Sequence, residues 1–493
     1  MEESSYWIET LGCPKNEVDS EKLVGVIESD GLVRADGPSE ADLVVVNTCA
    51  FIEAARRESV DTILELSSRR REGSRLVVTG CMAERYGKEL AESLPEVDLV
   101  AGFGCSPTFA LGAENGVAGT KTVAVKIPNR ATRTRATPER DGLDARLGSF
   151  DLLELPRPAP ETPWAYVKVA EGCDRICGFC AIPSFRGRQR SRPIESVVAE
   201  VESMLEGTEK DDGRGVGGIK EIVLVAQDLA AYGRDRVAGA DGFGPDATTR
   251  RSRGQTAQSE PIVSLTKEIS KLVPRTRLLY LYPSGLTDEL VDTVVSTGVS
   301  YFDLSLQHVS RAHLRRMRRW GDAERFMEKI SEIRSRDSGA TFRSSFILGY
   351  PGETESDHQE LLDFLEVAEL DWAGFFTYSR EDGTYARDLP DQVPAELAME
   401  RLRECTELQD AMTAFKRDSL VGEVKEVLVD SPGVARSVHE APEIDGIVEV
   451  PKSLEVGRLV DVVITGSLGT DLTGEPVDGS RFEDRDARSG SGD

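Results

Sequence analysis

Three cysteines within eight residues constrain this chain more than any other feature of its sequence. Cys173, Cys177 and Cys180 have the spacing C-x3-C-x2-C, and Gly172 and Gly178 allow the backbone around them to bend. Three thiolates on one loop can bind three irons of a 4Fe-4S cubane and leave the fourth iron without a protein ligand. A zinc ion would need a fourth ligand, and no further Cys or His stands nearby. The spacing therefore predicts a cluster whose open iron can bind a substrate or cofactor.

This loop follows the first of six apolar segments that helical patterns separate. We expect strands at 165–170, 221–226, 277–282, 301–306, 341–348 and 372–378, and helices at 194–205, 263–272, 288–296 and 355–367. Alternating strands and helices are typical of a parallel sheet. Six units without a clear seventh or eighth predict an incomplete (β/α)6 barrel over residues 159–400. The cysteine loop then lies at the carboxyl end of a barrel strand, where such folds place their active sites.

The first hundred residues show the same alternation and predict a parallel α/β sheet domain over residues 5–115. The expected strands are 6–11, 43–47, 76–79 and 97–101, and the expected helices are 16–29, 54–67 and 83–94.

Cys13, Cys49 and Cys81 each follow one of the first three strands of that predicted sheet. The carboxyl ends of parallel strands share one edge, where helix N-termini add positive potential, so we expect the three thiols to meet there. Buried structural cysteines are the alternative. Cys105 follows a fourth strand and stays open as a ligand from the pattern alone, although we interpret it and Cys405 as structural.

Three further segments differ in composition from these two domains. Residues 113–160 are rich in Thr, Arg, Gly and Pro, and most of them are interpreted as a linker or an elaborated connection. Residues 234–260 are interpreted as a flexible insertion after the second barrel strand. Apolar alternation returns near residue 410 and predicts strands at 423–429, 446–450 and 459–466, hence a small all-β barrel over 410–478. Residues 479–493 are polar and rich in Gly and Ser, and we expect a disordered tail.

Composition limits the location and the partners of the chain. A net charge of −27 argues against a general nucleic-acid binder and favours a basic protein partner, although an organism with generally acidic proteins would give the same charge. No stretch approaches the roughly 20 apolar residues that span a bilayer, and the N-terminus lacks the pattern of a signal peptide. We therefore expect a cytoplasmic protein without membrane contact, whose cysteines are reduced rather than paired.

The segment from Glu171 to Cys180 resembles the signature of the radical S-adenosylmethionine (SAM) superfamily. The resemblance implies that the open iron binds SAM and that one electron from a donor cleaves it to a 5′-deoxyadenosyl radical, which the protein positions and shields. It also implies that other strand ends contact the cofactor, with a turn or packing role as the alternative at each position. These candidate cofactor contacts are Gln227, Gln307, Gly349 and Phe346, the last in a strand beside adenine.

The N-terminal domain, the cysteine loop and the C-terminal module together resemble the methylthiotransferases over nearly the whole chain. The resemblance implies that Cys13, Cys49 and Cys81 hold an auxiliary 4Fe-4S cluster, so that the protein carries two clusters. The open iron of the auxiliary cluster would carry or donate sulfur, one SAM molecule would supply the methyl group and another the radical. The C-terminal module resembles a TRAM domain, a small β-barrel that engages the macromolecular substrate.

Two groups of methylthiotransferases are candidates, one that modifies a tRNA adenosine base and the RimO group, which modifies an aspartate of ribosomal protein S twelve. Pro14 and Lys15 follow Cys13, where tRNA-modifying relatives usually have Gln and a different residue. Further segments that resemble the RimO group are 181–187, 226–228, 306–308 and 317–319.

Membership of the RimO group implies that the adenosyl radical removes hydrogen from the aspartate β-carbon, because no general base could take that proton. The partner would be ribosomal protein S twelve, free or in the small ribosomal subunit. A tRNA methylthiotransferase and, more distantly, a non-catalytic iron–sulfur or RNA-binding protein are the alternatives.

A basic run follows the fourth barrel strand. It could face an acidic substrate group or ribosomal RNA, but we favour a solvated helix face. Its members are Arg311, Arg315, Arg316, Arg318 and Arg319.

Overall fold

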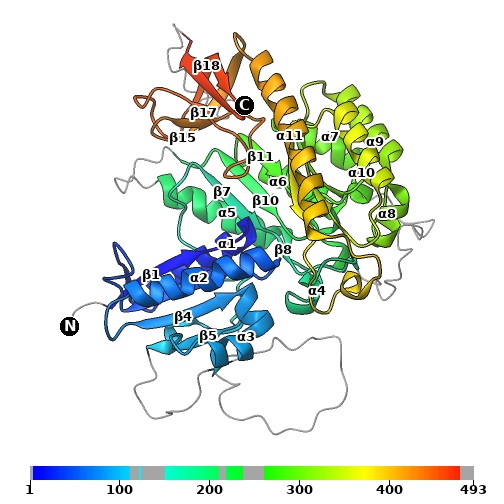
Figure 1. Ribbon diagram of the computed structural model, residues 1–493. Helices are drawn as coiled ribbons and strands as arrows, with labels where there is room; N and C mark the ends of the chain where they lie inside the picture. Colours follow the sequence, from blue (N-terminus) through cyan, green and yellow to red (C-terminus); the bar gives the residue numbers. More distant parts are fainter. Residues whose placement is uncertain (1–3, 112–121, 124–149, 210–217, 237–259, 478–493) are drawn as a thin grey trace.

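The computed structural model describes residues 4–111, 122–123, 150–209, 218–236 and 260–477. Three units of regular structure follow one another along the chain (Figure 1), and the central unit lies between the other two. None of the described helices has the length and apolar character that crossing a bilayer requires.

The N-terminal unit is a six-stranded, all-parallel sheet in the order β2-β1-β3-β4-β5-β6. The strands are β1 (Ser5–Thr10), β2 (Val33–Arg34), β3 (Leu43–Thr48), β4 (Arg75–Gly80), β5 (Leu99–Ala101) and β6 (Thr122–Val123). The helices are α1 (Pro14–Ser29), α2 (Glu53–Arg69), α3 (Cys81–Ser93) and the 3-10 turn η1 (Pro107–Ala110). The predicted parallel sheet is confirmed, whereas β2 and β6 were not predicted, because two residues leave no readable apolar pattern.

The central unit contains the six predicted parallel strands, but they form two three-stranded sheets, β7-β10-β11 and β12-β13-β14. The strands are β7 (Trp164–Lys168), β10 (Glu221–Val225), β11 (Arg275–Leu278), β12 (Tyr301–Gln307), β13 (Thr341–Leu348) and β14 (Trp372–Thr377). A single bridge between Leu281 and Leu304 joins the two sheets. The expected strand 277–282 is wrong in its bounds, because Tyr280 has a φ of 62°, which interrupts extended backbone.

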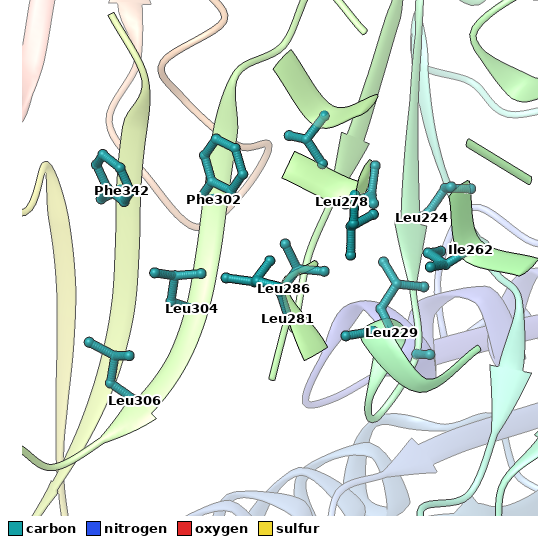
Figure 2. Packing of buried hydrophobic residues seen from close by; sticks show 14 of the residues in the cluster. Leu224, Leu229, Ile262, Leu278, Leu281, Leu286, Phe302, Leu304, Leu306 and Phe342 are labelled. Atoms are coloured by element: carbon teal, nitrogen blue, oxygen red, sulfur yellow. The ribbon is translucent and has the colours of Figure 1, made fainter. Parts of the chain in front are cut away.

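Helices cover the outer face of these strands. The longer ones are α5 (Ile194–Glu209), α6 (Pro261–Ile269), α7 (Asp288–Ser296), α9 (Ala323–Arg336) and α10 (Glu355–Ala368). The short elements are α4 (Ile182–Phe185), α8 (Arg311–Arg316), η3 (Leu229–Ala231), η4 (Arg234–Arg236), η5 (Pro283–Gly285), η6 (Tyr385–Asp388) and the antiparallel pair β8 (Ala170–Glu171) and β9 (Arg190–Ser191). Figure 2 shows that leucine and phenylalanine side chains from both sheets pack into one continuous layer across the interruption.

The third unit is a closed five-stranded barrel in the order β15-β16-β17-β19-β18, which confirms the predicted small β-barrel. Its strands are β15 (Val424–Ser431), β16 (Val434–Arg436), β17 (Val448–Glu449), β18 (Leu459–Leu468) and β19 (Asp471–Pro476). Before it lies α11 (Ala395–Ser419), a 25-residue helix that was not predicted. This helix runs without a break through both residue 400 and residue 410, the expected limits of the two flanking domains.

The connection between β16 and β17 enters the inner face of the central strands. Val438, Ala441 and Ile444 pack there with apolar side chains of β10 and β12. Val223 of β10 points to this inner face, while its neighbour Leu224 points outward to the helices, as side chains alternate along a strand. A segment of the third unit therefore fills the interior of the incomplete barrel.

Two expected irregular segments are partly ordered. Leu152 is buried in the core of the N-terminal sheet, and the backbone oxygen of Leu153 accepts a hydrogen bond from the ammonium of Lys22, so this stretch is an ordered connection rather than a linker. At the start of the expected insertion, Asp235 accepts a hydrogen bond from the backbone of Ser191. Residues 113–121 and 124–149, the insertion from 237 to 259 and the expected tail lie outside the described residues.

Candidate metal centres

Cysteines from three strand ends meet at one edge of the N-terminal sheet. Cys13 precedes the first turn of α1, Cys49 follows β3, and Cys81 is the first residue of α3. Burial is the main factor that raises the pKa of the Cys81 thiol to about 12, and the nearby Cys13 and Cys49 add to it. Burial and Cys13 also raise the pKa of Cys49. The three thiols therefore lie within electrostatic reach of one another, as their places in the sheet predict.

The backbone leaves little space around these thiols. A Cβ on Gly12 would lie 2.9 Å from the Cβ of Cys49, and one on Gly80 would lie 2.2 Å from Oδ1 of Asn47. Both glycines have a positive φ, of 105° and 90°, which other residues rarely adopt. Glycine at both positions lets the strand ends approach closely enough for the thiols to converge.

Asn16, fully buried in the first turn of α1, connects the three strand ends. Its Nδ2 donates to the backbone oxygens of Leu11 at 2.9 Å and of Thr48 at 3.1 Å, and the Sγ of Cys81 lies 3.5 Å from its Oδ1. Asn47 in turn donates to the backbone oxygen of Asn16 at 2.8 Å. These hydrogen bonds fix the relative positions of the segments that carry the cysteines.

A buried arginine of the central unit reaches into this site. Nη2 of Arg186 lies 3.0 Å from the Sγ of Cys81 and donates to Oδ1 of Asn16 at 2.6 Å. Nη1 contacts Glu171 at 2.9 Å and Asp19 at 3.2 Å. The guanidinium group therefore joins the N-terminal thiols to Glu171, which lies two residues before Cys173.

Lys168 and Gln227 complete this buried polar network. The Lys168 ammonium forms ion pairs with Asp19 and, at 2.7 Å, with Glu171. Nε2 of Gln227 donates to Oε1 of Glu171 at 2.9 Å. Burial alone would raise the pKa of Glu171, but Arg186 and Lys168 outweigh it and hold that pKa far below its ordinary value, so Glu171 is a carboxylate.

The second set of thiols lies on the loop that follows β7 and β8. Cys173 is buried, and Cys177 and Cys180 are half-buried. Burial raises the pKa of Cys173 and of Cys180 to about 12, with a further contribution from Cys177. The backbone of Gly178 donates to Met317 and accepts from Ala386, both at 2.8 Å, which fixes the turn between the last two cysteines.

Two arginines surround the second set. Nη1 of Arg319 lies 3.2 Å from the Sγ of Cys177, and its guanidinium carbon lies 4.3 Å from the ring centre of Tyr282. Arg175 lies over the same ring at 3.7 Å and forms an ion pair with Asp228 at 2.6 Å. The solvated helix face that we favoured for the basic run is therefore wrong for Arg319. The other four arginines of that run are exposed.

The candidate cofactor contacts have different surroundings. Oε1 of Gln227 is buried without a hydrogen-bond partner, and half-buried Gln307 ends β12 with a φ of 73°. Phe346 is fully buried and stacks on Phe375 at 5.7 Å. Gly349 lies against α11, where an added Cβ would come 2.5 Å from that of Ala398. Phe346 and Gly349 thus pack against other side chains, while the two glutamines present polar groups at the strand ends.

The remaining cysteines lie apart from both sets. Cys105 packs in the apolar cluster on the face of the N-terminal sheet opposite to that of Cys81. Cys405 lies on α11 in the core of the central unit. Burial raises the pKa of both, to about 11 and about 12, and no other cysteine contributes.

The donor sets fit iron–sulfur clusters better than single ions. Within the part of the chain that the structure describes, no three His, Cys, Asp or Glu side chains are close enough to share one metal ion. A cubane needs a wider arrangement, because each ligated iron takes its own thiolate. Each set consists of three thiols with one guanidinium within hydrogen-bond distance of a sulfur, where it can donate to a thiolate that ligates a cluster.

Sequence reasoning missed the network around Arg186, which lies six residues after Cys180 and has no characteristic spacing from it. Asn16, Asp19 and Lys168 were also missed, since each reads as an ordinary helix or strand residue. Only the contact between α1 and β7 brings them together.

Comparison with protein families matches three stretches of the chain. Residues 5–102 match an uncharacterized protein family, UPF0004, residues 167–365 match the radical SAM superfamily, and residues 421–477 match a TRAM domain. The ribosomal protein uS12 methylthiotransferase RimO of Kineococcus radiotolerans is 38% identical over 95% of this chain and 96% of its own. The RimO of Akkermansia muciniphila is 36% identical over 94% of this chain and 98% of its own. Among solved structures, the radical SAM methyltransferase TsrM from Kitasatospora setae covers 88% of this chain and 80% of its own, with 14% identity and a TM-score of 0.47.

Proposed function

The chain belongs to the RimO group of radical SAM methylthiotransferases, and from this premise we propose that it attaches a methylthio group to the β-carbon of an aspartate in ribosomal protein uS12. One observation carries the proposal. Two separate sets of three thiols lie in two adjoining domains, and the Arg186 network joins the segments that carry them. An enzyme that generates a radical at one site and supplies sulfur at another needs two such sets in a fixed relation.

The radical SAM family implies SAM and one 4Fe-4S cluster. We assign that cluster to Cys173, Cys177 and Cys180, and a second cluster to Cys13, Cys49 and Cys81. When bound, the first cluster and SAM supply a radical able to take hydrogen from an unactivated carbon, and the second cluster supplies sulfur. Burial raises the pKa of Cys81, Cys173 and Cys180, so cluster assembly must displace the protons of these thiols.

The chain's own residues orient and shield the site. Arg186 and Asn16 hold the segment of Cys81 in place, and Arg319 stays beside Cys177. The rings of Tyr280 and Tyr282 project from the end of β11 and carry cations on their faces. These bulky groups limit water around the reacting carbon, which protects a radical from side reactions.

A competition between two substrates tests the function. Reconstituted protein, a one-electron reductant and SAM are incubated without oxygen with a uS12 peptide and unmodified tRNA, and mass spectrometry locates any methylthio group. We expect modified peptide and untouched tRNA. The variant Cys105→Ala serves as a control that should behave like the wild type. Modified tRNA with untouched peptide would reject the assigned substrate, and no modification of either would reject the enzyme activity.

A further inference from the structure

Lys15 carries a buried positive charge that the rest of the protein does not neutralise. It is the second residue of α1, two residues beyond Cys13, and only 8% of it is exposed. Its Nζ lies 3.1 Å from the ring centre of Tyr280. Over the residues that the structure describes, this ammonium has no hydrogen bond or ion pair with a side chain or backbone group. A buried ammonium normally has such a partner, because removal from water is costly.

The carboxylates near Lys15 are already engaged. Asp303 pairs with Arg343 at 3.2 Å and accepts a hydrogen bond from the backbone of Tyr280 at 2.8 Å. Asp19 is held by Lys168 and Arg186. The Lys15 ammonium therefore faces the aromatic ring of Tyr280, at the start of the helix that Cys13 precedes.

The two tyrosines that follow β11 each carry a cation, and each cation lies near one of the two sets of thiols. Tyr280 carries Lys15 on its ring, on the side of Cys13, and Tyr282 carries Arg319, which contacts Cys177. Tyr280 has a left-handed backbone conformation, with a φ of 62°, that the hydrogen bond to Asp303 holds in place. A strained and fixed residue at this position indicates that the place of its ring matters.

We propose that the Lys15 ammonium binds the carboxylate of the target aspartate. The proposal rests on the proposed function and deepens it. The carbon to be modified is bonded to that carboxylate and must lie between the two sets of thiols, and Lys15 lies beside one set, on a ring two residues from Tyr282. Arg175 is paired with Asp228 and Arg319 contacts Cys177, whereas none of the described residues forms a hydrogen bond or ion pair with the Lys15 ammonium. A compact ammonium with three donors suits a single carboxylate, and a tRNA base has no carboxylate to offer.

A double-mutant cycle on peptide binding tests this contact. Anaerobically reconstituted wild type and Lys15→Met are titrated, without reductant, into a labelled uS12 peptide and into the same peptide with asparagine at the target. Truncating one partner of a buried charge pair costs about 2–5 kcal/mol, so the wild type should bind the aspartate peptide roughly 30-fold or more tightly than the asparagine peptide. Lys15→Met should bind the two peptides with affinities that differ by less than about threefold, because the interaction between the ammonium and the carboxylate is then absent.

Two further variants control for indirect effects. Lys88→Met removes a lysine from the same domain whose side chain is 86% exposed, and it should keep the wild-type preference. Lys15→Arg retains the charge and should recover part of the preference even where Lys15→Met folds poorly. Iron content and the electron paramagnetic resonance spectrum of the reduced clusters report whether cluster assembly is intact.

The outcomes separate the two proposals. A Lys15→Met variant that still prefers the aspartate peptide overturns the contact, and so does one that shifts the spectrum of the N-terminal cluster without changing the preference. If the wild type modifies the peptide while the cycle shows no coupling, only the role of Lys15 is rejected. If the wild type neither binds nor modifies the peptide, both proposals fail together.

Discussion

The two ends of the central strands carry buried ionic clusters that resemble one another in composition and differ in what they touch. At the carboxyl end, Lys168, Glu171 and Arg186 meet Asp19 of the N-terminal unit. At the amino end, Glu221 of β10 pairs with Arg277 at 2.6 Å and with Arg436 of the third unit at 3.1 Å. Each cluster therefore joins the central strands to a different neighbouring domain.

The two clusters differ in the groups that the N–H donors of their arginines contact. The guanidinium of Arg436 donates to Glu221, Asp430 and the backbone oxygen of Glu440, all of which are structural partners. Arg186 uses one nitrogen for carboxylates and the other for Asn16 and Cys81. The same buried charge thus fixes a domain at one end and orients a thiol at the other, in agreement with the rule that the carboxyl end of such strands is the functional one.

Replacing single cysteines should have the largest effect on activity, and it separates the roles of the two sets of thiols at the carboxyl end. We expect Cys177→Ala to abolish both formation of 5′-deoxyadenosine and methylthio transfer, because it removes a ligand of the SAM-binding cluster. Cys49→Ala should abolish the methylthio product while 5′-deoxyadenosine still forms. Chromatography of the nucleoside and mass spectrometry of the peptide measure the two steps. Methylthio product from Cys49→Ala would contradict the role of the N-terminal thiols, and Cys405→Ala is the matched control.

Removing one arginine from each ionic cluster tests whether the clusters differ in role. Arg186→Gln and Arg436→Gln each remove one of the cations that neutralise a buried cluster of carboxylates, so each should lower the free energy of unfolding in urea by about 3–5 kcal/mol. Only Arg186→Gln should also reduce methylthio transfer per folded molecule. Equal activity losses in the two variants would mean that Arg186 acts through stability alone. Arg57→Gln removes an exposed pair with Glu53 and should change stability by less than about 1 kcal/mol.

Acid should lower the stability of the protein by protonating Glu221, at the amino end of the central strands. Burial opposes ionisation, but Arg277, Arg436 and Arg275 hold its pKa at about 2, below the ordinary value of 4.5. The stabilisation is therefore complete above pH 4.5 and is lost as the pH falls from 4.5 towards 2, with a total on the order of 3 kcal/mol. Unfolding free energies of wild type and Glu221→Gln across this range measure it. Parallel pH profiles of the two proteins would contradict the assignment.

A smaller difference in stability should separate a glycine beside the N-terminal thiols from a glycine elsewhere in the same domain. Gly80→Ala places a Cβ 2.6 Å from the backbone oxygen of Thr48, whereas Gly31→Ala meets nothing within 4 Å, although both glycines have a positive φ. Both variants should lose about 1–3 kcal/mol of stability from backbone strain at a positive φ, and Gly80→Ala should lose about 1–3 kcal/mol more from overpacking. Thermal unfolding of the two variants gives the difference. Equal losses would show that the site beside Cys49 is not tightly packed.

Local signals in the sequence predicted the elements that carry their own pattern. The apolar run of β3 and the spacing of Cys173, Cys177 and Cys180 each lie within a few residues, so strand and loop could be recognised directly. The helix α11 was missed because its buried residues include arginine, glutamine and threonine, which give a weak apolar stripe. The end of β11 was placed too late because nothing in the sequence marks the left-handed Tyr280.

The candidate site was predictable only as far as topology allows. The meeting of Cys13, Cys49 and Cys81 followed from parallel strands sharing an edge, which needs no contact information. Asn16 and Arg186 were not predictable, since their roles depend on how α1 packs against the central unit. The charge of Lys15 was visible in the sequence, but its lack of a partner is a property of the folded protein alone.

The segment between β16 and β17 has a consequence for how such an enzyme could be shortened or recombined. Trp372 and Tyr166 donate hydrogen bonds to backbone oxygens of this segment, and Ala441 and Ile444 fill the lumen of the central strands. A truncation at the end of α11 would thus remove the segment that fills the interior of the central strands as well as the C-terminal barrel. The apolar interior would then be exposed to water, and the protein would be prone to aggregate. A chimaera that exchanges the C-terminal barrel must supply a β16–β17 segment that fits the same interior, so the barrel cannot be exchanged freely in evolution.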